Sequence, residues 1–171
     1  QLAQFSSLEQ LMGVQETMNN VAAGIQAMNS ASMASLLGTE VVAQGDTIRL
    51  DEGDTPELGW AAAGPMTEAK LTITNEAGEV VRTLDLGDVD AEGSITWDGL
   101  DQDGNPLPEG RYSFKVTGTD ADGNATLAAG RITGVVDGMD YASGAPQPSI
   151  DGVSVSIGDI LTLRVPDASD A

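Results

Sequence analysis

The stretch that decides the fold is SITWDGLDQDGNPLPEGRYSFKVTGTDADGN, residues 94–124. Ile95 and Trp97 alternate with polar neighbours, and after a long acidic turn Tyr112, Phe114 and Val116 do the same. Alternation with a period of two, bounded by Gly, Pro, Asn and Asp, is typical of half-buried antiparallel strands. Only 4% of the chain is aromatic, and Trp, Tyr and Phe all occur in this stretch. We therefore expect this hairpin to form the core of a β-sandwich.

Charge and composition exclude several classes of function. The 171-residue chain has a formal net charge of −20, which argues against nucleic acid and against anionic membrane surfaces as partners. It contains no Cys and no His, so disulfides, thiolate nucleophiles and the commonest general base and transition-metal ligand are missing. No apolar run approaches the roughly 20 residues that span a bilayer. We expect no membrane insertion.

The N-terminal part of the chain has the spacing of an α-helix. Residues 6–37 begin with a capping box, in which the side chains of Ser6 and Glu9 bond to each other's backbone amides. Apolar residues then follow at alternating intervals of three and four: Leu11, Val14, Met18, Val21, Ile25 and Met28. This seam either packs on the helix's own domain or joins copies of the chain, and it is our candidate self-assembly seam. The helical segment is assigned to residues 1–38.

From residue 39 the pattern becomes that of strands. Two short strands within 39–56 cannot bury a core alone, so we expect them to pair with strands of 129–166 in a five-stranded barrel. Residues 57–128 carry their own strand series with regular turns, which favours an immunoglobulin or fibronectin III-like sandwich. The predicted fold class is mainly β with an N-terminal α-helix, the sandwich being inserted into a discontinuous barrel. Residues 167–171 would be a tail.

Two acidic turns, residues 101–105 and 120–124, are candidate Ca²⁺ sites. An EF-hand loop needs a bidentate Glu at its twelfth position, but that position is Tyr112 counted from Asp101 and Arg131 counted from Asp120. Asp and Asn also close turns with their own side chains, and Gly supplies positive φ. We therefore expect structural turns and no metal or cofactor.

Catalysis has even less support in the sequence. Asp98 with Asp101 or Glu109 would imitate the two carboxylates of a glycosidase, but no pocket-forming aromatic cluster accompanies them. No nucleophile elbow, P-loop or zinc-protease motif occurs. Trp60 and Trp97 are expected in the core rather than as ligand platforms. The sequence predicts a protein that is not an enzyme.

Three segments resemble one known family. Residues 1–10, QLAQFSSLEQ, are similar to the helical signature of the bacterial flagellar hook-capping family, also called basal-body rod modification or hook assembly scaffold proteins. Residues 97–112 resemble that family's immunoglobulin-like insert. Residues 130–135 and 157–160 resemble its tudor-like, SH3-like barrel. The resemblance covers nearly the whole chain in the right order, although the family's segment before Gln1 is missing.

The resemblance implies a non-enzymatic scaffold for flagellar hook assembly. Family members sit at the tip of the growing hook, oligomerise as a cap and guide the polymerisation of hook-protein subunits. The implied partners are further copies of the chain, hook-protein subunits and the flagellar export apparatus. The resemblance supplies no catalytic residues. The alternative functions are an extracellular adhesive or Ca²⁺-binding β-module and, as a third class, a glycan-active enzyme.

Overall fold

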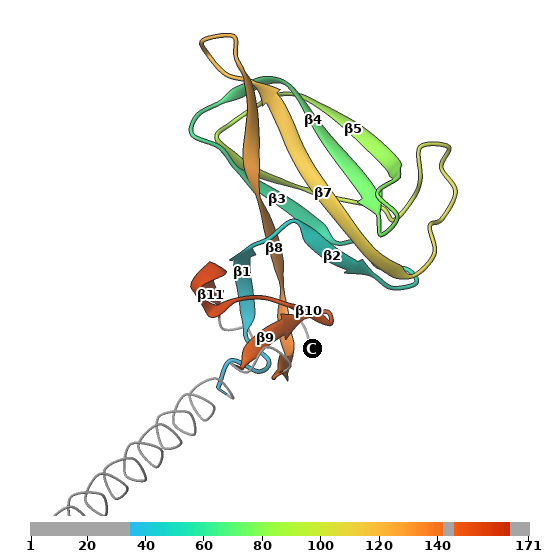
Figure 1. Ribbon diagram of the computed structural model, residues 1–171, viewed down its shortest axis with the longest axis vertical. Helices are drawn as coiled ribbons and strands as arrows, with labels where there is room; N and C mark the ends of the chain where they lie inside the picture. The colour runs from blue at the N-terminus through green and yellow to red at the C-terminus, as the bar shows by residue number, and fades with distance from the viewer. Residues whose placement is uncertain (1–34, 142–145, 165–171) are drawn as a thin grey trace, which may run out of the picture. The chain divides into compact units, whose positions relative to one another are not determined.

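One long strand connects the whole β-structure. In the computed structural model, which describes residues 35–141 and 146–164, the strand β8 (Ala125–Asp140) has 16 residues and pairs with four other strands. Along its length it meets, in turn, β7 (Gly110–Thr119), β3 (Glu57–Ala61), β1 (Glu40–Gln44) and β9 (Gln147–Ile150). Figure 1 shows β8 running from beside β7 down to β9. β8 is the central strand of the structure, along which the other strands are arranged.

The remaining strands extend this arrangement on its free sides. β7 also pairs with β4 (Met66–Asn75) and β2 (Thr47–Leu50). The outer strands each pair with one neighbour, namely β5 (Val80–Val89) with β4, β6 (Glu92–Thr96) with β3, β10 (Val153–Ser154) with β9, and β11 (Ile160–Arg164) with β1. Every pairing is antiparallel. The sheet is therefore open, with edges at β5, β6, β10 and β11 and a further edge at β2, which pairs with β7 alone.

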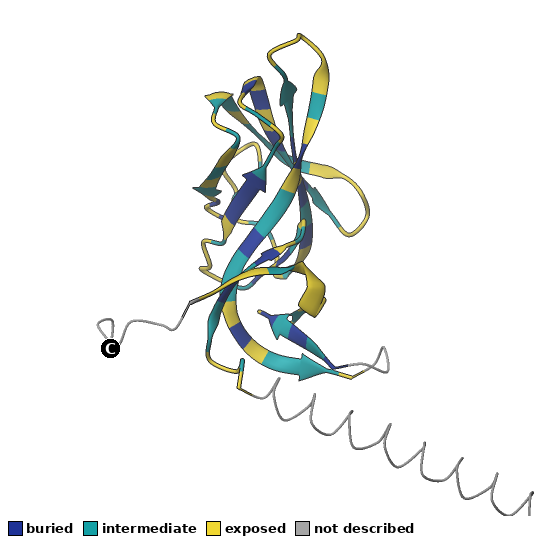
Figure 2. Ribbon diagram, turned by 90° about the vertical axis from the view of Figure 1, so that its left-hand side faces the viewer, coloured by how far each residue is buried: buried dark blue, intermediate teal, exposed yellow. Residues whose placement is uncertain are grey.

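The period-two pattern of the sequence matches the burial of the strands. Along β7 the side chains of Tyr112, Phe114 and Val116 are buried, while Lys115 between them is exposed. Trp97 is 1% exposed, and its ring meets that of Tyr112 edge-on at a centroid distance of 5.4 Å. Figure 2 shows buried segments within the strands and exposed ones mostly in the loops. Alternation thus predicted the inward face correctly.

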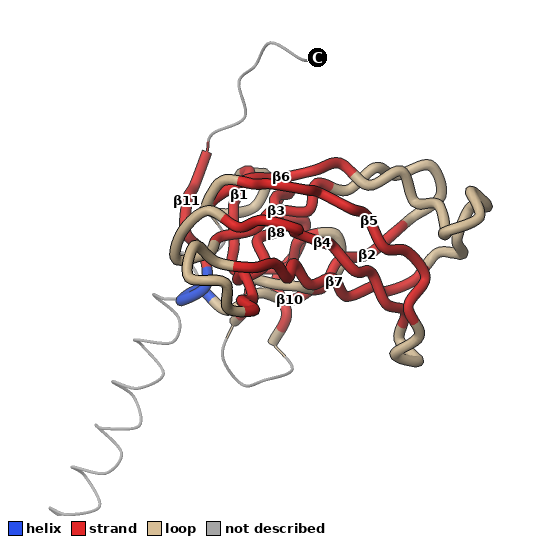
Figure 3. The backbone as a smooth tube through the Cα atoms, turned by 90° about the horizontal axis from the view of Figure 1, so that it is seen from above, coloured by secondary structure: helices blue, strands red, loops and turns tan. Residues whose placement is uncertain are grey.

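The described residues are mainly β, as predicted, but the predicted arrangement of the strands is wrong. The described residues contain no α-helix, and their one helical segment is the short 3₁₀ turn η1 (Ile157–Asp159), drawn in blue in Figure 3. The predicted helix over 6–37 falls almost entirely outside the described residues. The sandwich inserted into a closed barrel is replaced by one open sheet, since β2 pairs with β7 and β3 pairs with β8.

The physical reason is the continuity of β8. No Pro interrupts residues 125–140, so every residue of the strand can donate a backbone hydrogen bond. The strand therefore continues past residue 128 and pairs with β7 up to that point and with β3, β1 and β9 after it. The separate assignment of domains to 39–56 with 129–166 and to 57–128 stays a prediction.

The expected hairpin between residues 94 and 117 is also corrected. β6 pairs with β3, whereas β7 pairs with β2, β4 and β8. The intervening loop therefore crosses between strands that are not neighbours, and its two ends meet through the contact of Trp97 with Tyr112. The aromatic residues pack across the core rather than along one hairpin.

A close backbone approach occurs where β7 and β8 separate. The turn between β1 and β2 lies in the gap between these two diverging strands, which we call the fork. There the Gly45 amide donates to the Gly130 carbonyl oxygen at 3.0 Å. A Cβ atom on Gly130 would lie 2.5 Å from the Gly45 carbonyl oxygen. Glycine at this position is therefore required for the fork to close.

All of these strands lie within residues 37–171, which form a compact unit. Within the part of the chain that the structure describes, no helix has both the length and the apolar composition needed to cross a bilayer.

Candidate interaction site

The two acidic turns are closed by their own side chains. Asp101 Oδ1 accepts hydrogen bonds from the backbone amides of Asp103 and Asn105 at 2.9 and 2.8 Å. The Asp101 amide donates in turn to the Asn105 carbonyl oxygen at 2.8 Å, and Gly104 has a φ of 82°. The hydrogen bonds to its carboxylate hold the pKa of Asp101 below its usual range, and the bond from the Asn105 backbone amide is the largest cause.

The second turn repeats this geometry. Asp120 Oδ1 accepts from the amides of Asp122 and Asn124 at 3.0 and 2.8 Å, and Gly123 has a φ of 81°. The backbone bond from Asn124 is again the main cause that lowers the pKa of Asp120.

A third copy of the turn lies between β4 and β5. Asn75 Oδ1 accepts from the amides of Ala77 and Glu79 at 3.0 and 2.9 Å, with Gly78 at a φ of 80°. The common pattern is Asp or Asn followed three residues later by Gly, and it was available in the sequence. The hydrogen bonds explain all three as structural turns. Among the described residues, no group of three or more acidic side chains is placed to hold a metal ion.

The structure separates Asp101 from the other two carboxylates considered for catalysis, Asp98 and Glu109, which line the same groove. Asp101 faces its own turn, whereas Asp98 accepts from the Leu100 amide at 3.1 Å and, with Glu109, lines a neighbouring groove. Trp60 and Trp97 are both buried. Trp60 Nε1 donates to the Asp90 carbonyl oxygen at 3.3 Å. Both indoles belong to the core, as the sequence predicted.

The loop of residues 97–109 is held to the core at its beginning. Trp97 Nε1 donates to the Leu100 carbonyl oxygen at 3.1 Å. The Leu107 amide donates to the Gly99 carbonyl oxygen at 3.0 Å, which ties the two arms of the loop together. These bonds hold the beginning of the loop against the core.

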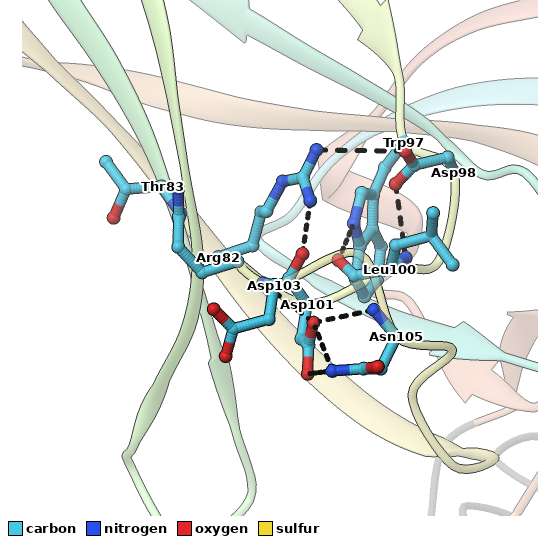
Figure 4. A network of polar contacts seen from close by, with 9 residues as sticks. Arg82, Thr83, Trp97, Asp98, Leu100, Asp101, Asp103 and Asn105 are labelled. Atoms are coloured by element: carbon cyan, nitrogen blue, oxygen red, sulfur yellow. Dashed lines mark hydrogen bonds and ion pairs between the residues drawn. The ribbon is translucent and has the colours of Figure 1, made fainter.

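Further contacts hold the rest of the loop. The Tyr112 hydroxyl donates to the Pro108 carbonyl oxygen at 2.8 Å. Figure 4 shows the Arg82 guanidinium reaching toward both Asp98 and Asp101. It donates to the Asp101 carbonyl oxygen and lies 3.7 Å from a carboxylate oxygen of Asp98. The loop is therefore rigidly positioned beside β5.

A groove of about 600 Å³ lies between this loop and the turn that follows β2. The two walls meet at Gly99 and Leu50. A Cβ atom added to Gly99 would lie 3.2 Å from Leu50 Cδ1. The apolar lining residues are Leu50, Leu100, Pro106, Leu107 and Pro108. The acidic ones are Asp51, Glu52, Asp54, Asp98 and Glu109. We call this site the acidic groove.

Only part of the negative charge of the acidic groove is neutralised. Arg49 Nε lies 2.9 Å from Asp51, and Arg82 lies near Asp98. Within the described residues, Glu52, Asp54 and Glu109 form no ion pair.

The negative field also reaches beyond the groove. Partial desolvation, followed by the charges of Asp137, Asp54 and Asp51, raises the pKa of Asp151.

The sequence did not identify this groove. Its two walls are separated by more than 40 residues, and only the pairing of Leu50 with Gly110 brings them together. The one available signal was that both loops combine acidic residues with Pro or Gly. The candidate self-assembly seam, in contrast, lies wholly outside the described residues, so its role stays a prediction.

Comparison with known proteins places this fold in a family. Residues 45–122 match the family model described as the FlgD Ig-like domain. The chain is 31% identical over 137 residues to the basal-body rod modification protein FlgD of Salmonella typhimurium, an alignment that covers 75% of the chain. The chain belongs to the FlgD family. It spans 58% of the length of that FlgD relative.

Other FlgD proteins agree with this assignment. The Escherichia coli K12 FlgD is 29% identical over 137 residues, covering 75% of the chain and 58% of the relative. The crystal structure of FlgD from Xanthomonas campestris, described as giving insights into hook capping essential for flagellar assembly, has a TM-score of 0.66 at 24% identity. It covers 78% of this chain and 97% of that one. FlgD from P. aeruginosa has a TM-score of 0.63 at 24% identity, with 74% and 97% covered, and these two structures support the fold.

Proposed function

We propose that this protein is a non-enzymatic scaffold that caps the bacterial flagellar hook during its assembly. The observation that carries the proposal is the FlgD Ig-like domain at residues 45–122. The curated relatives that the chain matches are named basal-body rod modification protein FlgD. The Xanthomonas relative, of the same fold, is described in connection with hook capping.

In the finer proposal, copies of the chain assemble as a cap at the tip of the growing hook and guide hook-protein subunits into place. The flagellar export apparatus delivers the protein to that position. These roles follow from the family resemblance. They fit an open β-sheet with a rigid loop system, since such a surface offers recognition sites on a fixed framework.

The test is made in the source bacterium by deleting the DNA that encodes residues 45–122 from its chromosomal gene. We expect cells without hooks in electron micrographs, with hook protein released into the medium because nothing retains it at the tip. Restoring the full gene should restore hooks.

A matched control carries the conservative change Asp122→Asn, which removes one exposed charge and leaves the turn intact. This strain should form normal hooks. Normal hooks in the deletion strain would contradict the proposed function.

A further inference from the structure

The acidic groove has features of a preformed recognition site. Its longer wall, residues 98–109, is fixed by the bonds of Leu107, Pro108 and Arg82 described above. Its opposite wall is a turn in which the Asp54 amide donates to the Asp51 carbonyl oxygen at 3.1 Å. A rigid site loses little conformational entropy when it binds a partner.

The lining of the groove defines the chemistry of its occupant. Leu100 and Leu107 are partly exposed within it, and Pro106 and Pro108 are exposed. The exposed carboxylates Glu52, Asp54 and Glu109 stand around these apolar groups and form no ion pair among the described residues, although the charge of Glu109 helps to raise the pKa of Arg49. An apolar floor with an acidic rim that is only partly neutralised complements a ligand that is both apolar and cationic.

We propose that the acidic groove binds a short extended segment of another protein, in which Lys or Arg side chains flank Leu or Pro. The inference rests on the proposed function, because it names the chemistry by which the scaffold would hold a partner protein. A volume of about 600 Å³ lies within the range of about 300–1,000 Å³ of sites that take small ligands. The site therefore accommodates a few residues rather than the face of a domain.

The chain itself does not contain such a segment. It has seven Lys and Arg residues in all, and the two nearest in sequence are Arg111 and Lys115. Arg111 already donates to the Gly152 carbonyl oxygen at 3.3 Å. Two copies that each carry a net charge of −20 also repel one another. These facts favour a different protein over a second copy as the occupant.

The experiment uses the whole chain and the synthetic peptide Gly-Lys-Pro-Leu-Lys-Pro-Leu-Lys-Gly, acetylated and amidated. Binding is measured by calorimetry, and the binding site by amide chemical shifts of ¹⁵N-labelled protein. We expect shifts around residues 50–54 and 98–109. Affinity should fall when NaCl is raised from about 50 to about 500 mM, because salt screens the exposed carboxylates.

The decisive variant combines Glu52→Gln, Asp54→Asn and Glu109→Gln. These side chains are exposed, so the fold should persist, as checked by circular dichroism. Removing three cation contacts should weaken peptide binding about tenfold.

The control combines Glu76→Gln, Asp88→Asn and Asp122→Asn. It removes the same charge from exposed positions outside the groove lining and should change affinity by less than about twofold.

Three results would overturn the proposal: no binding at millimolar peptide, shifts confined to another surface, or an equal loss of affinity in both variants. The last would mean attraction by net charge alone. Hook formation tests the proposed function and peptide binding tests the groove, so failure of one is distinguishable from failure of the other.

Discussion

Asp101 and Asp120 connect the stability of this protein to pH. Each ionised carboxylate accepts two short backbone bonds that a neutral acid accepts less well. Their pKa values are lowered in the folded chain. The stability they contribute is fully present above the ordinary Asp pKa of about 3.9, and it is lost as the pH falls through the lowered values.

We expect the double variant Asp101→Asn with Asp120→Asn to melt below the wild type at neutral pH. The amide oxygen keeps the turn but accepts more weakly than a carboxylate. The difference in melting temperature should shrink as the pH falls below about 4. Thermal melts from neutral to strongly acidic pH measure it.

The matched control is Asp103→Asn with Asp122→Asn, whose wild-type residues contribute only backbone amides to the same turns. It should show no such pH-dependent difference. Neither double variant should respond to millimolar Ca²⁺. A Ca²⁺-dependent rise in melting temperature that the Asp101 and Asp120 changes abolish would instead support the Ca²⁺-binding alternative.

Trp97 contributes to stability through its burial. Its side chain is 1% exposed, contacts Tyr112 and donates to Leu100. We expect Trp97→Ala to lower the free energy of unfolding by about 3–5 kcal/mol, measured by urea denaturation. Leu127→Ala is the control, because this side chain is 64% exposed, and it should cost under about 0.5 kcal/mol. A loss below about 1 kcal/mol for Trp97→Ala would contradict the structural role of the indole.

At the level of secondary structure, β5 is an edge strand whose free backbone groups are covered at Val81 and Thr83. The Gln102 amide donates to the Val81 carbonyl oxygen at 3.0 Å, and Gln102 Oε1 accepts from the Thr83 amide at 3.0 Å. Gln102 thus occupies the positions that a neighbouring strand would use. Covering an edge in this way prevents pairing between molecules.

We expect Gln102→Ala to expose the Thr83 amide. Hydrogen exchange of that amide, followed by NMR, should accelerate, while the Gln102 amide stays protected because its backbone bond remains. The variant should also associate more readily in light scattering, since an uncovered edge pairs with other chains.

Gln102→Glu is the control, because its carboxylate still offers an acceptor oxygen at the same distance along the side chain. It should keep Thr83 protected at neutral pH. Equal exchange of Thr83 in wild type and Gln102→Ala would mean that the side chain does not cover the edge.

For the whole molecule, the dominant property is negative charge. A net charge of −20 implies mutual repulsion in the folded state, because acidic side chains greatly outnumber basic ones. That repulsion opposes non-specific association between copies of the chain, and it favours basic partners.

We expect the melting temperature to rise when NaCl is increased from about 20 to about 500 mM, because the Debye length falls from roughly 20 Å to below 10 Å. The triple variant Glu52→Gln, Asp54→Asn and Glu109→Gln should show a smaller rise, since it carries less repulsion. A melting temperature that falls with salt would indicate that attractive ion pairs outweigh the repulsion.

The local parts of this fold could be read from the sequence. Alternation placed Tyr112, Phe114 and Val116 inside, because a strand turns successive side chains to opposite faces. The dipeptide Asp151-Gly152 is a two-residue hairpin signal, and it forms the tight turn between β9 and β10, where both residues have positive φ. The Asp-x-x-Gly turns followed from side-chain chemistry alone. Each of these depends on residues within a few positions of one another.

Only the tertiary structure decided how the strands are shared. β8 pairs with β7, β3, β1 and β9 in turn, and its own sequence does not specify which strands these are. The acidic groove exists because Leu50 pairs with Gly110 and brings two distant loops together. Such pairings are chosen by the burial of the whole core and by the backbone bonds of every strand at once. A single sequence displays the patterns that make pairing possible, whereas the fold selects the partners.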